Sequence, residues 1–196
     1  MIRFLKNILV RFIFPQIKET RTHMNPIRPS HIFNYILNQK ILRKNKFLYW
    51  PVHPNSVITY PENIKLGIDT SPGYAHGCYI QGIGSIEIGD YSSFACNTGI
   101  ISANHDLLNP SIHVKGKVVI GKYCLVSMGS VILPGTKLGD HVIVRPNSVV
   151  DGDFSDGYCI LSGNPAKIVF KFPDEIRDRF VKPNHAQKYI GFKKVK

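Results

Sequence analysis

Six aliphatic residues recur at intervals of six between residues 120 and 150, and this period limits the fold more than any other feature of the chain. They are Ile120, Val126, Ile132, Leu138, Val144 and Val150. An α-helix repeats about every 3.6 residues and a strand about every two, so neither produces this period. A solenoid of short strands does, because each strand sends one aliphatic side chain inward before the chain turns a corner. The segment therefore predicts an all-β solenoid.

The same frame extends toward the N-terminus with one interruption. The residues that continue it are Ile88, Phe94 and Ile100, preceded by the less regular Leu66, Ile80 and Ile86. Twenty residues separate Ile100 from Ile120, which is not a multiple of six. We therefore expect an insertion in ISANHDLLNPSIHVKGKVVIG, residues 101–121, that is two residues longer than a whole number of repeats.

Corners are expected where glycine or small polar residues follow the aliphatics. Gly121 and Gly139 directly follow two of them, and the positions four residues after the aliphatics are mostly small or polar, namely Cys124, Ser130, Thr136, Val142 and Ser148. Glycine suits such corners because the backbone must bend tightly there.

The residues just before the inward aliphatics should face outward, yet most of them are apolar. They are Leu125, Val131, Lys137, Ile143 and Val149. With three strands per turn, residues 125 and 143 share one face, and residues 131 and 149 share another. Exposed apolar faces indicate a partner, so we expect self-association, with a cyclic trimer favoured.

The chain divides into three predicted parts. Residues 1–50 form a basic, amphipathic helical segment, residues 51–172 the solenoid, and residues 173–196 a helix with a basic tail. In the first part Ser30 is a plausible N-cap, followed at helical spacing by Ile32, Phe33, Ile36, Leu37, Ile41 and Leu42, and then by the aromatic cluster Phe47, Tyr49 and Trp50. In the last part FPDEIRDRFV (172–181) has acids early and arginines late, as suits a helix dipole.

A formal net charge of +12 indicates either an anionic partner or basic tails that aid solubility. No nucleic-acid-binding motif is present, so nucleic acid is not an expected partner. The N-terminal MIRFLKNILVRFIFPQIK is interrupted by Arg3, Lys6 and Arg11, so it is expected to pack on the protein or to lie on an anionic membrane surface. The four cysteines form no C-x-x-C pair and no dense framework, which favours reduced thiols and a cytoplasmic protein.

With these features in view, the chain resembles the left-handed β-helix acyltransferases, the bacterial hexapeptide-repeat transferases, and looks most like polysaccharide and sugar O-acetyltransferases. The resemblance covers roughly residues 57–172. It is carried by IGDYSSFACNTGIISANHD (88–106), ILPGTKLGD (132–140) and LSGNPAKIV (161–169). It implies a left-handed parallel β-helix with an inserted loop, acetyl-CoA as acyl donor, no metal, and a homotrimer with active sites between subunits. The implied acceptor is a hydroxyl of a sugar or surface-polysaccharide precursor. Residues 1–20 would suit peripheral attachment at the inner membrane face.

The same resemblance implies that His105 is the catalytic residue. A sugar hydroxyl is too weakly acidic to attack a thioester unaided near neutral pH, and a neutral imidazole within hydrogen-bond reach can take its proton. The acyl group is then expected to pass directly to the acceptor. For the acceptor, the resemblance implies contacts with Asn97, Asn104 and Asp106.

For coenzyme A, the positions implied by the resemblance are Ser127, Met128, Arg145, Pro146, Asp151, Gly152, Lys167 and Lys171. The charge of Lys167 suits the phosphates of the cofactor. The chain departs from its relatives at three places: Leu125 stands where tryptophan is common, Arg145-Pro146 replaces a pair of small residues, and Asp151 replaces threonine or a similar polar residue. Arg145 is a candidate for an additional phosphate contact.

Three alternatives remain open on the sequence. N-acetylation of an amino sugar would use the same base and donor. A non-catalytic solenoid scaffold would need no particular histidine. A zinc enzyme of the γ-carbonic anhydrase type shares the solenoid, but it needs three converging imidazoles, and the H-x₄-H pair of that family is missing here.

Overall fold

The computed structural model describes residues 36–67 and 70–181. The predicted amphipathic segment 1–20, the Ser30 cap and the basic tail after residue 181 lie outside these residues.

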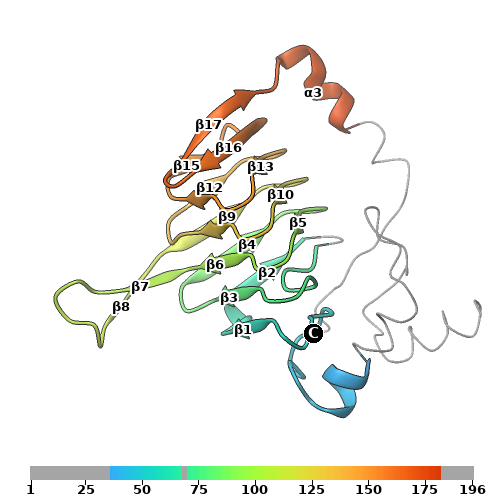
Figure 1. Cartoon of the computed structure of the whole chain (residues 1–196), viewed down its shortest axis with the longest axis vertical. Helices are drawn as coiled ribbons and strands as arrows, with labels where there is room; N and C mark the ends of the chain where they lie inside the picture. The colour runs from blue at the N-terminus through green and yellow to red at the C-terminus, as the bar shows by residue number, and fades with distance from the viewer. Residues whose placement is uncertain (1–35, 68–69, 182–196) are drawn as a thin grey trace, which may run out of the picture.

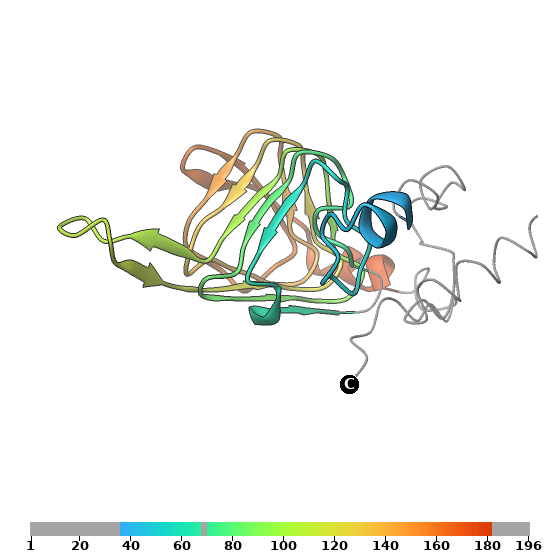
Figure 2. The ribbon, with the colours of Figure 1, turned by 90° about the horizontal axis from the view of Figure 1, so that it is seen from below.

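Short parallel strands form three sheets, which wrap around a common axis as a prism that is triangular in cross-section (Figures 1 and 2). The first sheet contains β1 (Val57–Thr59), β3 (Tyr79–Gln81), β6 (Gly99–Ile101), β11 (Val131–Ile132) and β14 (Val149–Val150). The second contains β2 (Ile64–Leu66), β4 (Ser85–Ile88), β9 (Lys117–Ile120), β12 (Lys137–Leu138) and β15 (Asp153–Phe154). The third contains β5 (Ser93–Phe94), β10 (Leu125–Val126), β13 (Ile143–Val144), β16 (Cys159–Gly163) and the antiparallel β17 (Ala166–Lys171).

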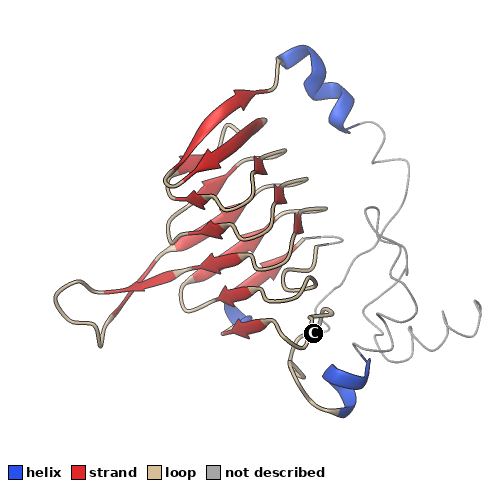
Figure 3. Cartoon of the chain, in the orientation of Figure 1, coloured by secondary structure: helices blue, strands red, loops and turns tan. Residues whose placement is uncertain are grey.

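From β3 to β16, each turn of the chain passes from the first sheet to the second and then to the third, so every coil contributes one strand to each sheet (Figure 3). We name the three edges of the prism after the sheets that they join: the first–second, second–third and third–first edges. A step of six residues moves the chain to the next sheet, and three steps return it to the same sheet.

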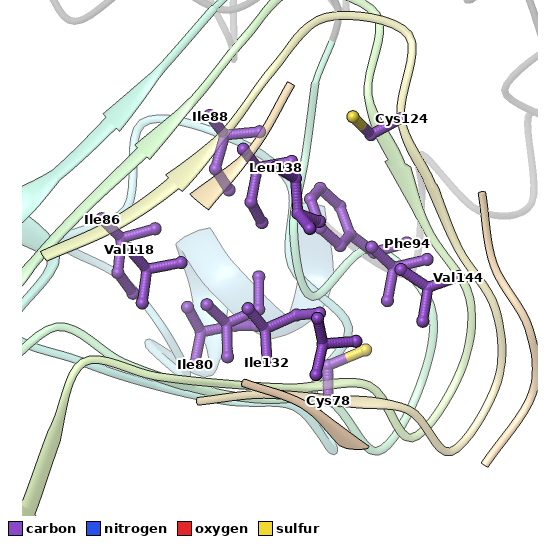
Figure 4. Packing of buried hydrophobic residues seen from close by; sticks show 14 of the residues in the cluster. Cys78, Ile80, Ile86, Ile88, Phe94, Val118, Cys124, Ile132, Leu138 and Val144 are labelled. Atoms are coloured by element: carbon purple, nitrogen blue, oxygen red, sulfur yellow. The ribbon is translucent and has the colours of Figure 1, made fainter. Parts of the chain in front are cut away.

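The interior is a stack of the predicted aliphatics (Figure 4). The six aliphatic residues that recur from Ile120 to Val150 are each at most 2% exposed. Within a sheet they lie directly over one another, as Ile100, Ile132 and Val150 do in the first sheet. Burial of apolar side chains is therefore the main force that holds the coils together.

The glycines at the second–third edge serve a purpose that differs from the predicted one. Gly121 and Gly139 do not have positive φ; they allow close stacking, because a Cβ on Gly121 would collide with the carbonyl carbon of Gly139. The left-handed conformation at this edge is adopted instead by four ring residues with φ between 46° and 59°: Tyr91, Tyr123, His141 and Tyr158. Their rings stack in order, with centroids 5.1, 4.9 and 4.9 Å apart.

The outward rows of the three sheets differ in character. Leu125 pairs with Ile143 and Val131 with Val149, so the predicted sharing of faces is confirmed. The first row consists of Val57, Tyr79, Gly99, Val131 and Val149, and the third of Ser93, Leu125, Ile143, Ile160 and Phe170. The second row is Lys65, Glu87, Val119, Lys137 and Asp153, with ion pairs of 3.1 Å (Lys65–Glu87) and 2.9 Å (Lys137–Asp153). Because its outward row is mostly charged, the second sheet is the face that we expect to be in contact with solvent.

The N-terminal part of the described chain caps the first coil. Trp50 is fully buried and its Nε1–H donates to the carbonyl of Pro72 at 2.9 Å, whereas Phe47, predicted in the same aromatic cluster, is 82% exposed. The predicted helix over residues 32–42 appears, in its described part, as a π-helix, η1 (Ile36–Ile41), with Ile41 and Leu42 exposed. A short 3₁₀ turn, η2 (Pro61–Asn63), connects β1 to β2.

At the other end, the β16–β17 hairpin leads into α3 (Asp174–Val181), which confirms the predicted C-terminal helix. Its first turn contains Asp174 and Glu175 and its last turn contains Arg179. All four cysteines are free thiols, and three of them are buried.

Candidate active site

The interruption of the six-residue period is a β-hairpin that projects from the prism at the first–second edge (Figures 1 and 2). Its strands are β7 (Ala103–His105) and β8 (His113–Lys115), paired antiparallel between β6 and β9. Because β6 and β9 are consecutive strands of one coil, a single step of six would suffice between Ile100 and Ile120. Ile120 is instead twenty positions after Ile100, so the step contains fourteen inserted residues. The predicted remainder of two was correct, but it concealed a much longer insertion.

The base of the hairpin is fixed by polar groups on the β-helix. The Gln81 side-chain carbonyl accepts a hydrogen bond from the Ala103 N–H at 3.0 Å, and the Gly116 N–H donates to the Ser102 carbonyl at 2.7 Å. Ser102 is fully buried, and its hydroxyl donates to the Gln81 carbonyl at 2.6 Å. Gln81 and Ser102 thus position the first strand of the hairpin, a role that the sequence did not indicate.

His105 is the last residue of β7, and its ring is held at one nitrogen. Its Nδ1 atom lies 2.6 Å from the carbonyl oxygen of Pro110. A carbonyl oxygen can only accept, so the contact is a hydrogen bond when the ring carries its proton on Nδ1. In the neutral ring Nε2 then has no proton and can accept one. His105 is exposed, so a substrate can reach it.

The turn that presents the Pro110 carbonyl is shaped by Asp106. Its Oδ1 accepts hydrogen bonds from the N–H groups of Leu108 and Asn109, both at 2.9 Å. Its own N–H donates to the carbonyl of Ile112 at 2.9 Å. Asp106, predicted to meet the acceptor, therefore has a structural task in the turn.

The tip of the hairpin carries two exposed leucines. Leu107 is 97% exposed and Leu108 is 95% exposed. His113 lies opposite His105 in the register, with the ring centroids 4.5 Å apart. No sequence motif indicates His113, because its position eight residues after His105 has meaning only once the hairpin register is known.

The residues predicted to bind coenzyme A lie in three places. Ser127, Met128, Arg145 and Pro146 lie at the third–first edge, where the Asn147 N–H donates to the Met128 carbonyl at 3.0 Å. Asp151 and Gly152 lie at the first–second edge, where the Gly152 carbonyl accepts from the Lys137 N–H at 3.0 Å. Lys167 and Lys171 are exposed on β17, and the turn before Lys167 reaches the third–first edge through the Gly163 N–H and the Ser148 hydroxyl, 3.2 Å apart.

One chain therefore brings only part of the predicted site together. Asn104 and Asp106 are on the hairpin with His105, and Asp151 and Gly152 are on the same edge, two coils further along. Asn97 lies at the third–first edge beside Met128, since the Gly129 N–H donates to the Cys96 carbonyl at 3.1 Å. The first sheet separates these two groups of residues.

The described part of the chain offers neither a metal cluster nor a membrane span. Within residues 36–67 and 70–181, no group of three or more His, Cys, Asp or Glu side chains is arranged to hold a metal ion. No helix in those same ranges has the length and apolar character needed to cross a bilayer.

Known proteins resemble this chain in sequence. Residues 110–152 match the family described as "Bacterial transferase hexapeptide (six repeats)". The chain is 28% identical over 151 residues to YvoF of Bacillus subtilis (strain 168), a candidate acetyltransferase, covering 77% of this chain and 70% of YvoF. It is 29% identical over 134 residues to WbbJ of Escherichia coli (strain K12), a candidate lipopolysaccharide biosynthesis O-acetyl transferase, covering 62% of this chain and 64% of WbbJ.

Solved structures share the architecture. A maltose O-acetyltransferase from Clostridium difficile 630 superposes with a TM-score of 0.60 at 22% identity, covering 88% of this chain and 89% of that one. A mutant of AntD, an N-acyltransferase from Bacillus cereus in complex with dTDP and coenzyme A, superposes with a TM-score of 0.54 at 22% identity, covering 70% and 89%. These likenesses confirm the predicted left-handed parallel β-helix. The chain is thus similar to the hexapeptide-repeat acyltransferases, in sequence over residues 110–152 and in fold over most of its length.

Proposed function

We propose that this protein transfers an acetyl group from acetyl-CoA to a hydroxyl of a sugar or of a surface-polysaccharide precursor, with His105 as general base. The observation that carries the proposal is the hydrogen bond from Nδ1 of His105 to the Pro110 carbonyl, on a hairpin inserted into a hexapeptide β-helix. It leaves Nε2 able to accept a proton where an acceptor can approach.

The reaction is a direct transfer. As the acceptor oxygen attacks the thioester carbonyl carbon, its proton passes to Nε2 of His105. The new C–O bond forms, the C–S bond breaks, and the proton returns from the imidazolium to the leaving thiolate of coenzyme A. General-base assistance of this kind contributes roughly 10²–10⁴-fold to the rate.

The arrangement of the donor residues supports a site between copies of the chain. In one chain, His105 and Asp151 are on one edge of the first sheet, while Met128 and Pro146 are on the other. A neighbouring copy whose third–first edge meets the hairpin would bring the two groups together. The apolar outward rows of the first and third sheets supply surfaces for such contacts, and a homotrimer is the assembly that we propose.

The acceptor and the location belong to the same proposal. The similarity to WbbJ favours a precursor of a surface polysaccharide as the acceptor. A cytoplasmic enzyme, attached peripherally at the inner membrane face through residues 1–20, fits that substrate. N-acetylation of an amino sugar remains the alternative, because the same base and donor serve both reactions.

The test uses acetyl-CoA with two acceptors, maltose and glucosamine, and follows the release of free coenzyme A thiol together with the mass of the sugar product. Mild alkali removes an O-acetyl ester and leaves an N-acetyl amide intact, so it separates the two reactions. Transfer to oxygen that disappears in His105→Ala supports the proposal. Alkali-stable acetylation of glucosamine alone would favour the amine alternative, and failure to bind acetyl-CoA would favour a scaffold.

A further inference from the structure

Within the described part of the chain, the ring of His105 meets a second group besides the Pro110 carbonyl. This group is His113, whose ring centroid lies 4.5 Å from that of His105 at an interplanar angle of 42°. The two residues are directly opposite each other in the β7–β8 register. Side chains of directly opposed residues in an antiparallel pair lie on the same face and contact each other.

The two faces of the hairpin differ. Because side chains alternate along a strand, Ala103, His105, His113 and Lys115 share one face, while Asn104 and Val114 share the other. The hairpin projects from the prism (Figure 1), and His105 is exposed. Its orientation therefore depends on local contacts within the hairpin.

We propose that His113 is a positioning residue for His105, an inference that rests on the proposed function of that histidine. The Pro110 carbonyl fixes which nitrogen carries the proton, and the ring of His113 restricts the plane in which His105 lies. Together they aim Nε2 at the acceptor hydroxyl. Such restriction matters because a general base acts only within hydrogen-bond reach and in the correct direction.

This role needs a flat ring at position 113, but it does not need an imidazole. His113→Phe keeps a ring that can pack on His105 and has no nitrogen to donate or accept. His113→Ala and His113→Gln remove the ring, the second while retaining a polar group. Val114→Ala is the matched control, because Val114 is on the same strand, 53% exposed, and on the opposite face.

The experiment measures kcat and KM for acetyl-CoA with each variant. We expect His113→Ala and His113→Gln to lower kcat about tenfold with KM within about twofold, and His113→Phe and Val114→Ala to keep kcat within about twofold of the wild type. If Phe is as defective as Ala, the imidazole itself is required and His113 acts on the substrate. If Ala retains full kcat, the ring has no positioning role. Either result overturns the proposal.

A second readout does not depend on turnover. Nitrogen-15 spectra of the imidazole groups in the wild-type protein should show His105 protonated at Nδ1. His113→Ala should reduce or broaden that signal, and His113→Phe should preserve it. An unchanged signal in His113→Ala would contradict the proposal. Absence of acetyl transfer by the wild type would count instead against the proposed function, so the two failures are distinguishable.

Discussion

The Nδ1 atom of His105 lies 2.6 Å from the carbonyl oxygen of Pro110, five residues further along the same hairpin. The acceptor is a backbone atom, so its presence depends on the turn and not on the side chain of residue 110. The turn itself is held by Asp106, which bonds the N–H groups of Leu108 and Asn109.

Replacing the tip, residues 107–111, by Asn-Gly should therefore remove activity without unfolding the protein. The two-residue turn still connects the paired strands, but the Pro110 carbonyl is lost. We expect kcat to fall by about 10²-fold or more, with a thermal midpoint within a few degrees of the wild type, because the tip is exposed. Pro110→Ala, which keeps the carbonyl, is the control and should retain most of the activity. Equal loss in both variants would show that the backbone acceptor is not the important feature.

Two glycines should lose stability to very different extents when replaced by alanine. A Cβ at Gly121 would collide with the backbone of Gly139, so Gly121→Ala must separate two coils. Gly135 has a φ of +87°, but nothing lies within 4 Å of its Cβ position. We expect Gly135→Ala to cost about 1 kcal/mol of conformational strain and Gly121→Ala several times as much, measured as the free energy of unfolding in urea. Similar losses of unfolding free energy in the two variants would mean that neighbouring coils can move apart at Gly121 with little loss of stability.

His141 should make the stability of the protein fall in mildly acidic solution. His141 is 6% exposed, with its ring stacked between those of Tyr123 and Tyr158, and burial lowers its pKa, although Asp140 partly opposes the shift. The folded state therefore favours the neutral ring. This contribution is fully present above the unfolded pKa of about 6.5 and is lost as pH falls through the lower folded value.

His141→Asn is the matched variant, because asparagine tolerates the left-handed conformation at this position and does not titrate. The decrease in thermal midpoint between pH 7.5 and pH 5.5 should be smaller in the variant than in the wild type. An identical decrease would assign the pH dependence to other groups.

Assembly should depend on the apolar outward rows. We expect the wild type to sediment with three times the mass of the 22.1 kDa chain, and Val149→Lys to shift sedimentation toward a single chain. Val119→Lys is the control, because Val119 occupies the equivalent outward position in the charged row of the second sheet. A wild-type protein that sediments as one chain would remove the basis for a site shared between copies.

The sequence predicted the parts of the structure that follow from its period. An inward residue every six positions requires a prism of short strands, and the six aliphatic residues that recur from Ile120 to Val150 are all buried. The same counting places Met128 and Pro146, eighteen residues apart, on one edge. It places Asp151 on the next edge, because five residues after Pro146 the chain has crossed the first sheet.

Other features could not be predicted, because they depend on contacts that produce no repeating pattern in the sequence. Counting in sixes gives the insertion only as a remainder, so the fourteen-residue insertion that forms the hairpin was hidden. The pairing of His105 with His113 depends on a strand register that forms locally. The spacing around Ile41 predicted a helix, but it did not reveal that the described part of this helix is a π-helix with Ile41 exposed.

The most direct test of the account is a comparison of wild type with His105→Ala in two assays on the same preparations: calorimetric titration with acetyl-CoA, and acetyl transfer to the best acceptor found. We expect equal affinity for acetyl-CoA in the two proteins and a rate of transfer that is lower in the variant by about 10²–10⁴-fold. A variant that retains most of its transfer activity would show that His105 is not the base. A wild type that does not bind acetyl-CoA would contradict the acetyltransferase function itself.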